Sequence, residues 1–92
     1  MSIEIIDSNS KKCVYKISYT SISHYEEIID KFNKKYNNLF DFNNDFRLYE
    51  NHIRFIIELI GKEINKNSEL LKFQKFLMNF VDRNKTLIVI GN

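Results

Sequence analysis

The spacing of apolar residues changes along this chain, and that change limits the folds open to it. Every second residue from Cys13 to Tyr19 is apolar or aromatic, which is typical of a strand with one buried face. Three isoleucines within residues 2–8 indicate another short strand. The stretch between the two is rich in Asp, Ser and Asn, whose side chains favour turns. We therefore predict strands over residues 2–8 and 13–20, joined as a hairpin.

Helical spacing replaces this alternation in the middle of the chain. Apolar residues recur at three- and four-residue intervals, and Ser23 followed by Glu26 fits a capping box. These features predict a first helix over residues 23–39, with a loop over residues 37–45 after it. Ser68 begins another stretch of the same kind, which predicts the last helix of the chain.

Residues 46–64 fit two structures. Alternating apolar and β-branched residues would make a hairpin over residues 46–60. On a helical wheel, however, the polar residues fall in one arc and the apolar residues in the opposite arc. A ladder of alternating charge at i,i+4 spacing is also present, formed by Glu50, Arg54, Glu58 and Lys62. A strand gives no reason for such a ladder, so we predict a helix.

Residues 86–90 form an apolar run near the C-terminus, which predicts a strand buried on both faces and hence a central position in the sheet. The predicted fold is one α+β domain over residues 1–92, in the order β-β-α-α-α-β. Its three-stranded sheet combines the N-terminal hairpin with the C-terminal strand, and three helices pack against it. The alternative with a hairpin over residues 46–60 gives the order β-β-α-β-β-α-β.

The composition is unusual, and it weakens the inference of a ligand from the abundant Asn or from the basic pI. Ala and Pro are absent, and Ile, Asn and Lys together fill 37 of the 92 positions. We interpret this as coding bias in an AT-rich genome, such as that of a low-GC bacterium, a phage, a plasmid or a large DNA virus. The abundant Asn and the basic pI are therefore not read as signatures of a ligand.

Cellular location is limited by three features. The longest aliphatic run is Leu87–Ile90, far short of the ~20 residues that span a bilayer. Residues 1–12 lack the apolar core of a signal peptide. Cys13 is the single cysteine, so no disulfide can form within the chain. We expect a cytoplasmic protein, in the producing cell or in a host cell.

No group of residues predicts catalysis, a cofactor or a metal ion. Cys13, His24 and His52 lie on different elements without the spacing of metal ligands. A Cys13–His24 nucleophile pair lacks any third residue that would orient it. Gly61 and Gly91 are the only glycines, which excludes a glycine-rich phosphate loop. We therefore expect a protein that is not an enzyme and uses no cofactor and no metal.

Bulky apolar residues exceed what three helices on a small sheet are expected to bury. Leu48, Phe55 and Leu59 flank the predicted second helix, and Phe76 and Met78 flank the third. Leftover apolar patches mark protein interfaces, so these five residues are the predicted partner-binding surface. Homodimerisation through the second or third helix is a linked hypothesis.

The alternative is a regulator that binds nucleic acid. Lys31, Lys34 and Lys35 cluster beside Tyr36 near the end of the first helix, and several basic residues on one face are needed to neutralise phosphates. Acidic residues interleave every basic cluster, however. The sequence therefore favours a small cytosolic protein that binds another protein, for example an inhibitor, an immunity protein or an accessory factor of a mobile element.

Overall fold

The computed structural model describes residues 2–63, 67–82 and 86–91 and confirms an α+β fold with three α-helices and one antiparallel sheet of four strands. The elements, in chain order, are β1 (Ser2–Asp7), β2 (Cys13–Ser18), the 3-10 helix η1 (Tyr19–Tyr25), α1 (Glu26–Tyr36), β3 (Phe46–Leu48), α2 (Glu50–Gly61), α3 (Ser68–Val81) and β4 (Leu87–Ile90).

The sheet has the strand order β2-β1-β4-β3, and each neighbouring pair is antiparallel. The predicted hairpin of β1 and β2 and the predicted central position of β4 are confirmed. The sheet is wider than predicted because β3 adds a fourth strand at the edge of β4.

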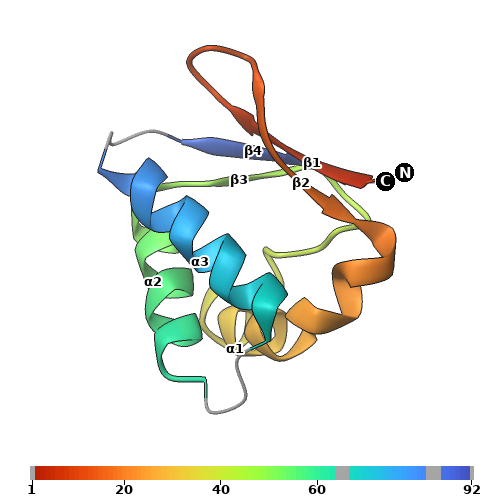
Figure 1. The fold of residues 1–92 in the computed structure, drawn as a ribbon, viewed down its shortest axis with the longest axis vertical. Helices are drawn as coiled ribbons and strands as arrows, with labels where there is room; N and C mark the ends of the chain where they lie inside the picture. The colour runs from red at the N-terminus through yellow and green to blue at the C-terminus, as the bar shows by residue number, and fades with distance from the viewer. Residues whose placement is uncertain (1, 64–66, 83–85, 92) are drawn as a thin grey trace.

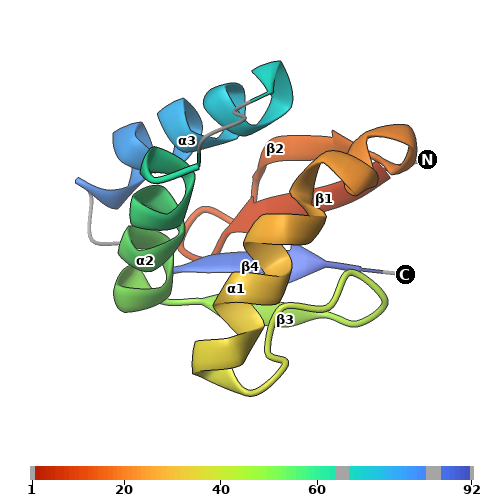
Figure 2. The same ribbon diagram turned by 90° about the horizontal axis from the view of Figure 1, so that it is seen from below.

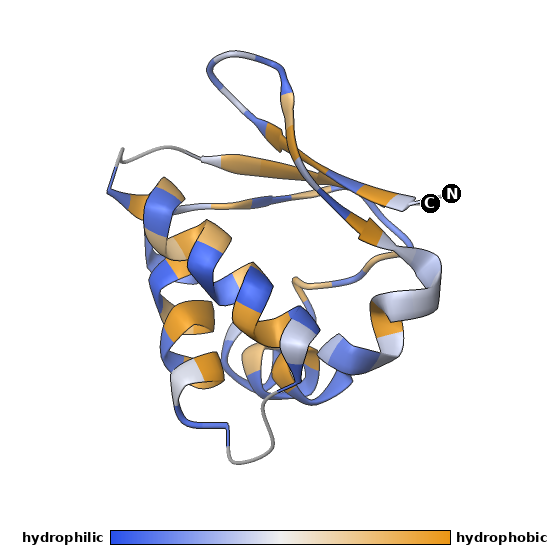
Figure 3. Cartoon of the chain, in the orientation of Figure 1, coloured by the Kyte–Doolittle hydropathy of each residue, from blue (hydrophilic) through white to orange (hydrophobic). Residues whose placement is uncertain are grey.

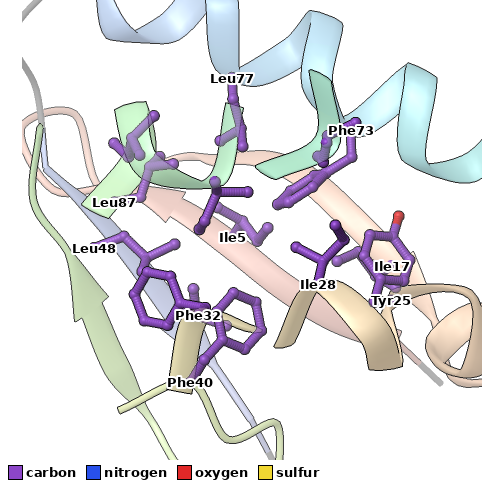
Figure 4. Packing of buried hydrophobic residues seen from close by; sticks show 14 of the residues in the cluster. Ile5, Ile17, Tyr25, Ile28, Phe32, Phe40, Leu48, Phe73, Leu77 and Leu87 are labelled. Carbon is purple, nitrogen blue, oxygen red and sulfur yellow. The ribbon is translucent and has the colours of Figure 1, made fainter. Parts of the chain in front are cut away.

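All three helices lie on one side of the sheet (Figures 1 and 2). The strand residues that face the helices form the floor of the core, and six of them are below 2% exposed: Ile3, Ile5, Ile17, Leu48, Leu87 and Val89. Phe32 from α1 and Phe73 and Leu77 from α3 pack onto this floor (Figure 4). Because side chains alternate between the two sides of a strand, the remaining strand residues lie on the opposite face of the sheet. None of the described helices packs on that face (Figures 1 and 2).

The start of the first helix differs from the prediction. Residues Tyr19–Tyr25 form a 3-10 helix, and α1 begins only at Glu26. The predicted capping box of Ser23 and Glu26 is wrong, because the N-cap residue is Tyr25 and its side chain makes no capping bond. The Tyr25 ring is buried, and its hydroxyl donates a hydrogen bond to Glu69 at 3.2 Å. Burial of this large side chain fixes the chain there more strongly than a local cap would.

The first helix also ends three residues earlier than predicted, at Tyr36. Asn37 and Asn38 adopt left-handed backbone conformations with φ of 53° and 63°, which asparagine tolerates better than most residues. The amide of Asn33 then holds the turn closed, because it donates to the Phe40 carbonyl and accepts from the Phe40 N–H, each at 2.9 Å.

The segment of residues 46–64 contains both predicted structures in part. Phe46–Leu48 forms β3, so the predicted helix does not begin at residue 46. From Glu50 to Gly61 the chain is helical, and the alternative hairpin over residues 46–60 is wrong. Two rungs of the predicted charge ladder are present as 2.8 Å ion pairs, Glu50–Arg54 and Glu58–Lys62. Residues 64–66, onto which the prediction extended, lie outside the described residues.

The last predicted helix is confirmed as α3, but its cap is the preceding residue. Asn67, not Ser68, is the N-cap, and its side chain accepts a hydrogen bond from the Leu70 N–H at 2.8 Å. An N-cap of this kind satisfies one of the free N–H groups in the first turn of a helix.

Candidate functional site

The five residues predicted to bind a partner do not form one surface. Leu48 is completely buried in β3, so it belongs to the core and its assignment to an exposed surface is corrected. Phe55 and Leu59 are half-buried on α2, and Phe55 packs against α1. Phe76 stacks on Tyr15 of β2 with ring centroids 4.6 Å apart. Only Met78, on the outer side of α3, is largely exposed, at 51%.

The lysines proposed for nucleic acid already have contacts within the chain. Lys31 forms a 3.2 Å ion pair with Glu63. The Lys35 ammonium lies 4.5 Å from the centre of the Phe55 ring, a cation–π contact. Tyr36 accepts a hydrogen bond from Asn51 at 3.5 Å. Lys34 is exposed next to them. The structure therefore brings the predicted residues together, but it directs two of the three lysines towards the chain itself.

Cys13 and His24 are separated by the whole of β2. Cys13 is exposed at the start of that strand, where its thiol donates to the Tyr15 carbonyl at 3.5 Å. His24 is exposed in η1, beyond the other end of the strand. A strand of this length spans about 17 Å, so the two side chains do not form a nucleophile and base.

A polar hollow of about 290 Å³ lies between η1, α1 and the start of α3, lined by Ser23, His24, Glu26, Glu27, Glu63, Asn67 and Leu70. A hydrogen bond to Glu63 raises the pKa of Glu27. The pKa of Glu63 is lowered by this same bond and also by Lys31. The Glu63 side chain is only 8% exposed. Glu27, Glu63 and Lys31 therefore interact with one another, which links α1 to the segment after α2.

His52 lies where α1 and α2 meet. Its Nδ1 accepts a hydrogen bond from the Tyr49 backbone N–H at 3.1 Å, at the start of α2. The rings of Phe32 and Tyr36 pack edge-on against the imidazole. Burial lowers the pKa of His52 below its ordinary value of 6.5. The neutral imidazole is thus the form that the folded chain favours.

We expect His52 to make the fold less stable in mild acid. Since its pKa is lower in the folded chain than in the unfolded chain, the unfolded chain takes up a proton first as pH falls. The free energy of unfolding should be unaffected by this group above about pH 7.5 and should decrease as pH falls through about 6.5. Urea unfolding of wild type and His52→Asn across this range measures the effect. A variant whose stability falls as steeply as that of wild type would contradict this role.

The face of the sheet that carries no helices presents a row of aliphatic side chains. Ile6 of β1 lies directly opposite Ile88 of β4, and Ile88 lies opposite Arg47 of β3. On the other side Ile6 is paired with the exposed Cys13 of β2, and Val14 follows Cys13 at an irregularity in the pairing. Ile90 lies one row further along β4. Ile6, Ile88 and Ile90 are half-buried, and Val14 is 38% exposed.

We call the residues Ile6, Val14, Ile88 and Ile90, with Glu4, Lys16 and Arg47 around them, the helix-free face. Figure 3 shows apolar stretches in β1 and β4, at the centre of the sheet. Lys16 lies opposite Glu4, which in turn lies opposite Ile90. The two basic residues are on the edge strands β2 and β3. The aliphatic row therefore has Glu4 beside it on the central strand β1, and the two basic residues lie at the margins of the face.

The prediction overlooked this face, although the sequence contained a signal for it. The run of four aliphatic residues in β4 predicted burial on both sides of the strand. Leu87 and Val89 are fully buried under the helices, but none of the described elements covers Ile88 and Ile90 (Figure 1). The adjacent isoleucines Ile5 and Ile6 give β1 the same two-sided character. On the face that the fold leaves open, β4 presents Ile88 and Ile90, and β1 presents Ile6 beside Ser2 and Glu4.

Within residues 2–63, 67–82 and 86–91, no helix has the length and apolar character needed to cross a bilayer. Over the same ranges, no three His, Cys, Asp or Glu side chains are grouped as metal ligands. Comparisons with models of known protein families, with characterised proteins and with solved structures gave no match.

Proposed function

We propose that this protein is a non-enzymatic protein-binding domain whose interface is the helix-free face. The observation that supports this proposal is the aliphatic row of Val14, Ile6 and Ile88 across three strands, with Ile90 beside it. Contiguous apolar surface of this kind, edged by charged residues, is typical of sites where another protein docks.

A protein fits this face better than a nucleic acid does. Sheets that bind single-stranded nucleic acid present aromatic rings on which bases stack. Here the outward-facing residues of the four strands are aliphatic, charged, serine or Cys13, and the aromatic residue of β2, Tyr15, packs inward on Phe73. Glu4 also places a negative charge near the centre of the face. The Glu4 carboxylate would repel phosphates. Aliphatic side chains of a protein partner, by contrast, can cover the aliphatic row beside Glu4.

The small size and the coding bias support a role in which binding itself is the activity. An inhibitor, an immunity protein or an accessory factor of a mobile element needs one stable interface and no catalytic group. We propose that the protein acts in the cytoplasm of the producing cell or of a host cell.

An affinity capture from the native cell tests the interface. The wild-type chain should retain a cellular protein, and Ile88→Lys should lose it, because a lysine in the middle of the aliphatic row would be desolvated on binding. Met78→Lys is the matched control, since Met78 is an exposed apolar residue on α3, away from the face. Retention that Ile88→Lys leaves unchanged would contradict the proposal, and retention lost on nuclease treatment would favour the nucleic-acid alternative.

A further inference from the structure

We infer that a second copy of this chain covers the helix-free face, giving a symmetric dimer in which sheet packs on sheet. This inference rests on the proposed function, because both use the same face. It adds the identity of one occupant, which the apolar character of the face alone does not specify.

The row of residues across the sheet is arranged symmetrically about its centre. Ile6 and Ile88 are paired on the two central strands, β1 and β4. A two-fold axis parallel to the strands, passing between β1 and β4, would place Ile6 of each copy on Ile88 of the other copy. This reciprocal contact is what a two-fold interface requires. Ile6 and Ile88 are thus complementary to each other across the axis, which also places Glu4 of each copy over Ile90 of the other.

The side chains of the face favour a sheet as its occupant. The aliphatic members of the row are all β-branched, and no aromatic side chain stands out from it as an anchor for a pocket. Two pleated faces of this kind pack about 10 Å apart, with their strands about 30° from alignment. A second copy supplies such a face without any change in the backbone.

The charges at the margins agree with the same axis. It would bring β2 of one copy over β3 of the other. Lys16 of one copy would then lie near Asp45 of the other, the residue that precedes β3. Asp45 is exposed and accepts a hydrogen bond from the Gly91 N–H at 3.0 Å, which places it beside the row of Ile90. Arg47 belongs to the next row, with Ile88. Lys16 would therefore approach a carboxylate, and Arg47 would lie two residues, about 7 Å, further along the strand.

The area of the helix-free face sets the strength of self-association that we expect. β1 and β2 have six residues each, β4 has four and β3 has three. With strands ~4.8 Å apart and ~3.3 Å per residue, the face covers roughly 300 Å² on each copy. The total of roughly 600 Å² is smaller than the area that most specific interfaces bury. Self-association should therefore be weak, with a dissociation constant in the micromolar range.

Sedimentation equilibrium from about 5 to about 300 µM tests the dimer. The mass of wild type should rise with concentration from 11.1 kDa towards twice that value. Ile88→Lys should stay monomeric, with at least about tenfold weaker association, whereas Met78→Lys should behave as wild type. Val14→Lys, on an exposed edge position, is a second variant for the case that Ile88→Lys fails to fold, which circular dichroism would reveal.

Disulfide trapping tests the symmetry. In a Cys13→Ser background, Ile6→Cys chains and Ile88→Cys chains are mixed under mild oxidation. We expect the 6–88 crosslink to form faster than a crosslink from either of them to Met78→Cys, because the axis places residues 6 and 88 together. Equal rates would overturn the inference.

A wild-type chain that remains monomeric over the whole concentration range would also overturn the dimer. It would leave the proposed function intact if Ile88→Lys still abolished capture of a cellular protein. Conversely, a dimer that depends on Ile88 in a chain that captures no other protein would support the dimer and contradict binding of a separate target. The two failures are therefore distinguishable.

Discussion

Replacing Leu48 with alanine is expected to lower the free energy of unfolding by about 2–5 kcal/mol. Leu48 is completely buried on the helix-facing side of β3, opposite Leu87 of β4. Removing its terminal methyl groups leaves a void between the sheet and the helices, which the surrounding side chains can fill only in part. The size of the loss depends on how far the neighbours relax into this void. Urea denaturation followed by circular dichroism measures it.

Met78→Ala is the matched control for this prediction. It also shortens a large apolar side chain, but Met78 is exposed on α3, so its loss should change the free energy of unfolding by less than about 0.5 kcal/mol. Equal effects of the two substitutions, or a neutral Leu48→Ala, would show that β3 is not part of the core. Leu48 and Met78 were both predicted to bind a partner, and these two substitutions show which of them is a core residue and which is a surface residue.

Leu48 also shows why the sequence predicted the sheet incompletely. A strand of three residues is too short to display an alternating pattern of its own. Its place is set by β4, which is distant in sequence and supplies the neighbouring register partners. The helical spacing of apolar residues from Glu50 onward is strong, and residues 46–48 also fit it. Long-range pairing therefore decided the structure of these residues against the local pattern.

The elements with long, regular patterns were predicted well. Helices α2 and α3 and the hairpin of β1 and β2 follow from their apolar periodicity, because each buries one continuous face. The boundaries were less predictable. Tyr25 ends η1 by burying its ring, and Asn37 ends α1 by adopting a left-handed conformation. The local sequence does not indicate either boundary clearly, because each depends on contacts made in the folded chain.

The candidate site was predictable only in part. The two-sided apolar character of β4 indicated that both of its faces need cover. Which face the helices leave open depends on the register with β1 and on the path of α1 and α2, which periodicity does not contain. The periodicity therefore predicted exposed apolar residues on the helices, but most of these, such as Phe55 and Phe76, pack against neighbouring elements. The open apolar surface lies instead on the sheet.

Replacing Gly91 with alanine is expected to destabilise the fold by about 1–3 kcal/mol. Gly91 follows β4 directly and does not have a positive φ, so its requirement for glycine is one of space. A Cβ atom there would overlap the carbonyl oxygens of Asn44 and Phe42 and lie 2.9 Å from the Asn44 carbonyl carbon. Backbone atoms cannot turn aside as a flexible side chain can. The loop before β3 must therefore move away from the end of β4.

The matched control has the opposite sign. At Gly61, near the end of α2, an added Cβ would meet only the Gln74 amide nitrogen, at an ordinary contact distance of 3.6 Å. Gly61→Ala should therefore raise the free energy of unfolding by about 0.5–1 kcal/mol, since alanine restricts the unfolded chain and favours the helix. Urea unfolding of both variants, with hydrogen exchange of the β3 amides, measures the contrast. If Gly91→Ala were as stable as wild type and its β3 amides were equally protected, the close approach of the loop to β4 would be wrong, and with it the position of Asp45 on which the charge pairing across the dimer depends.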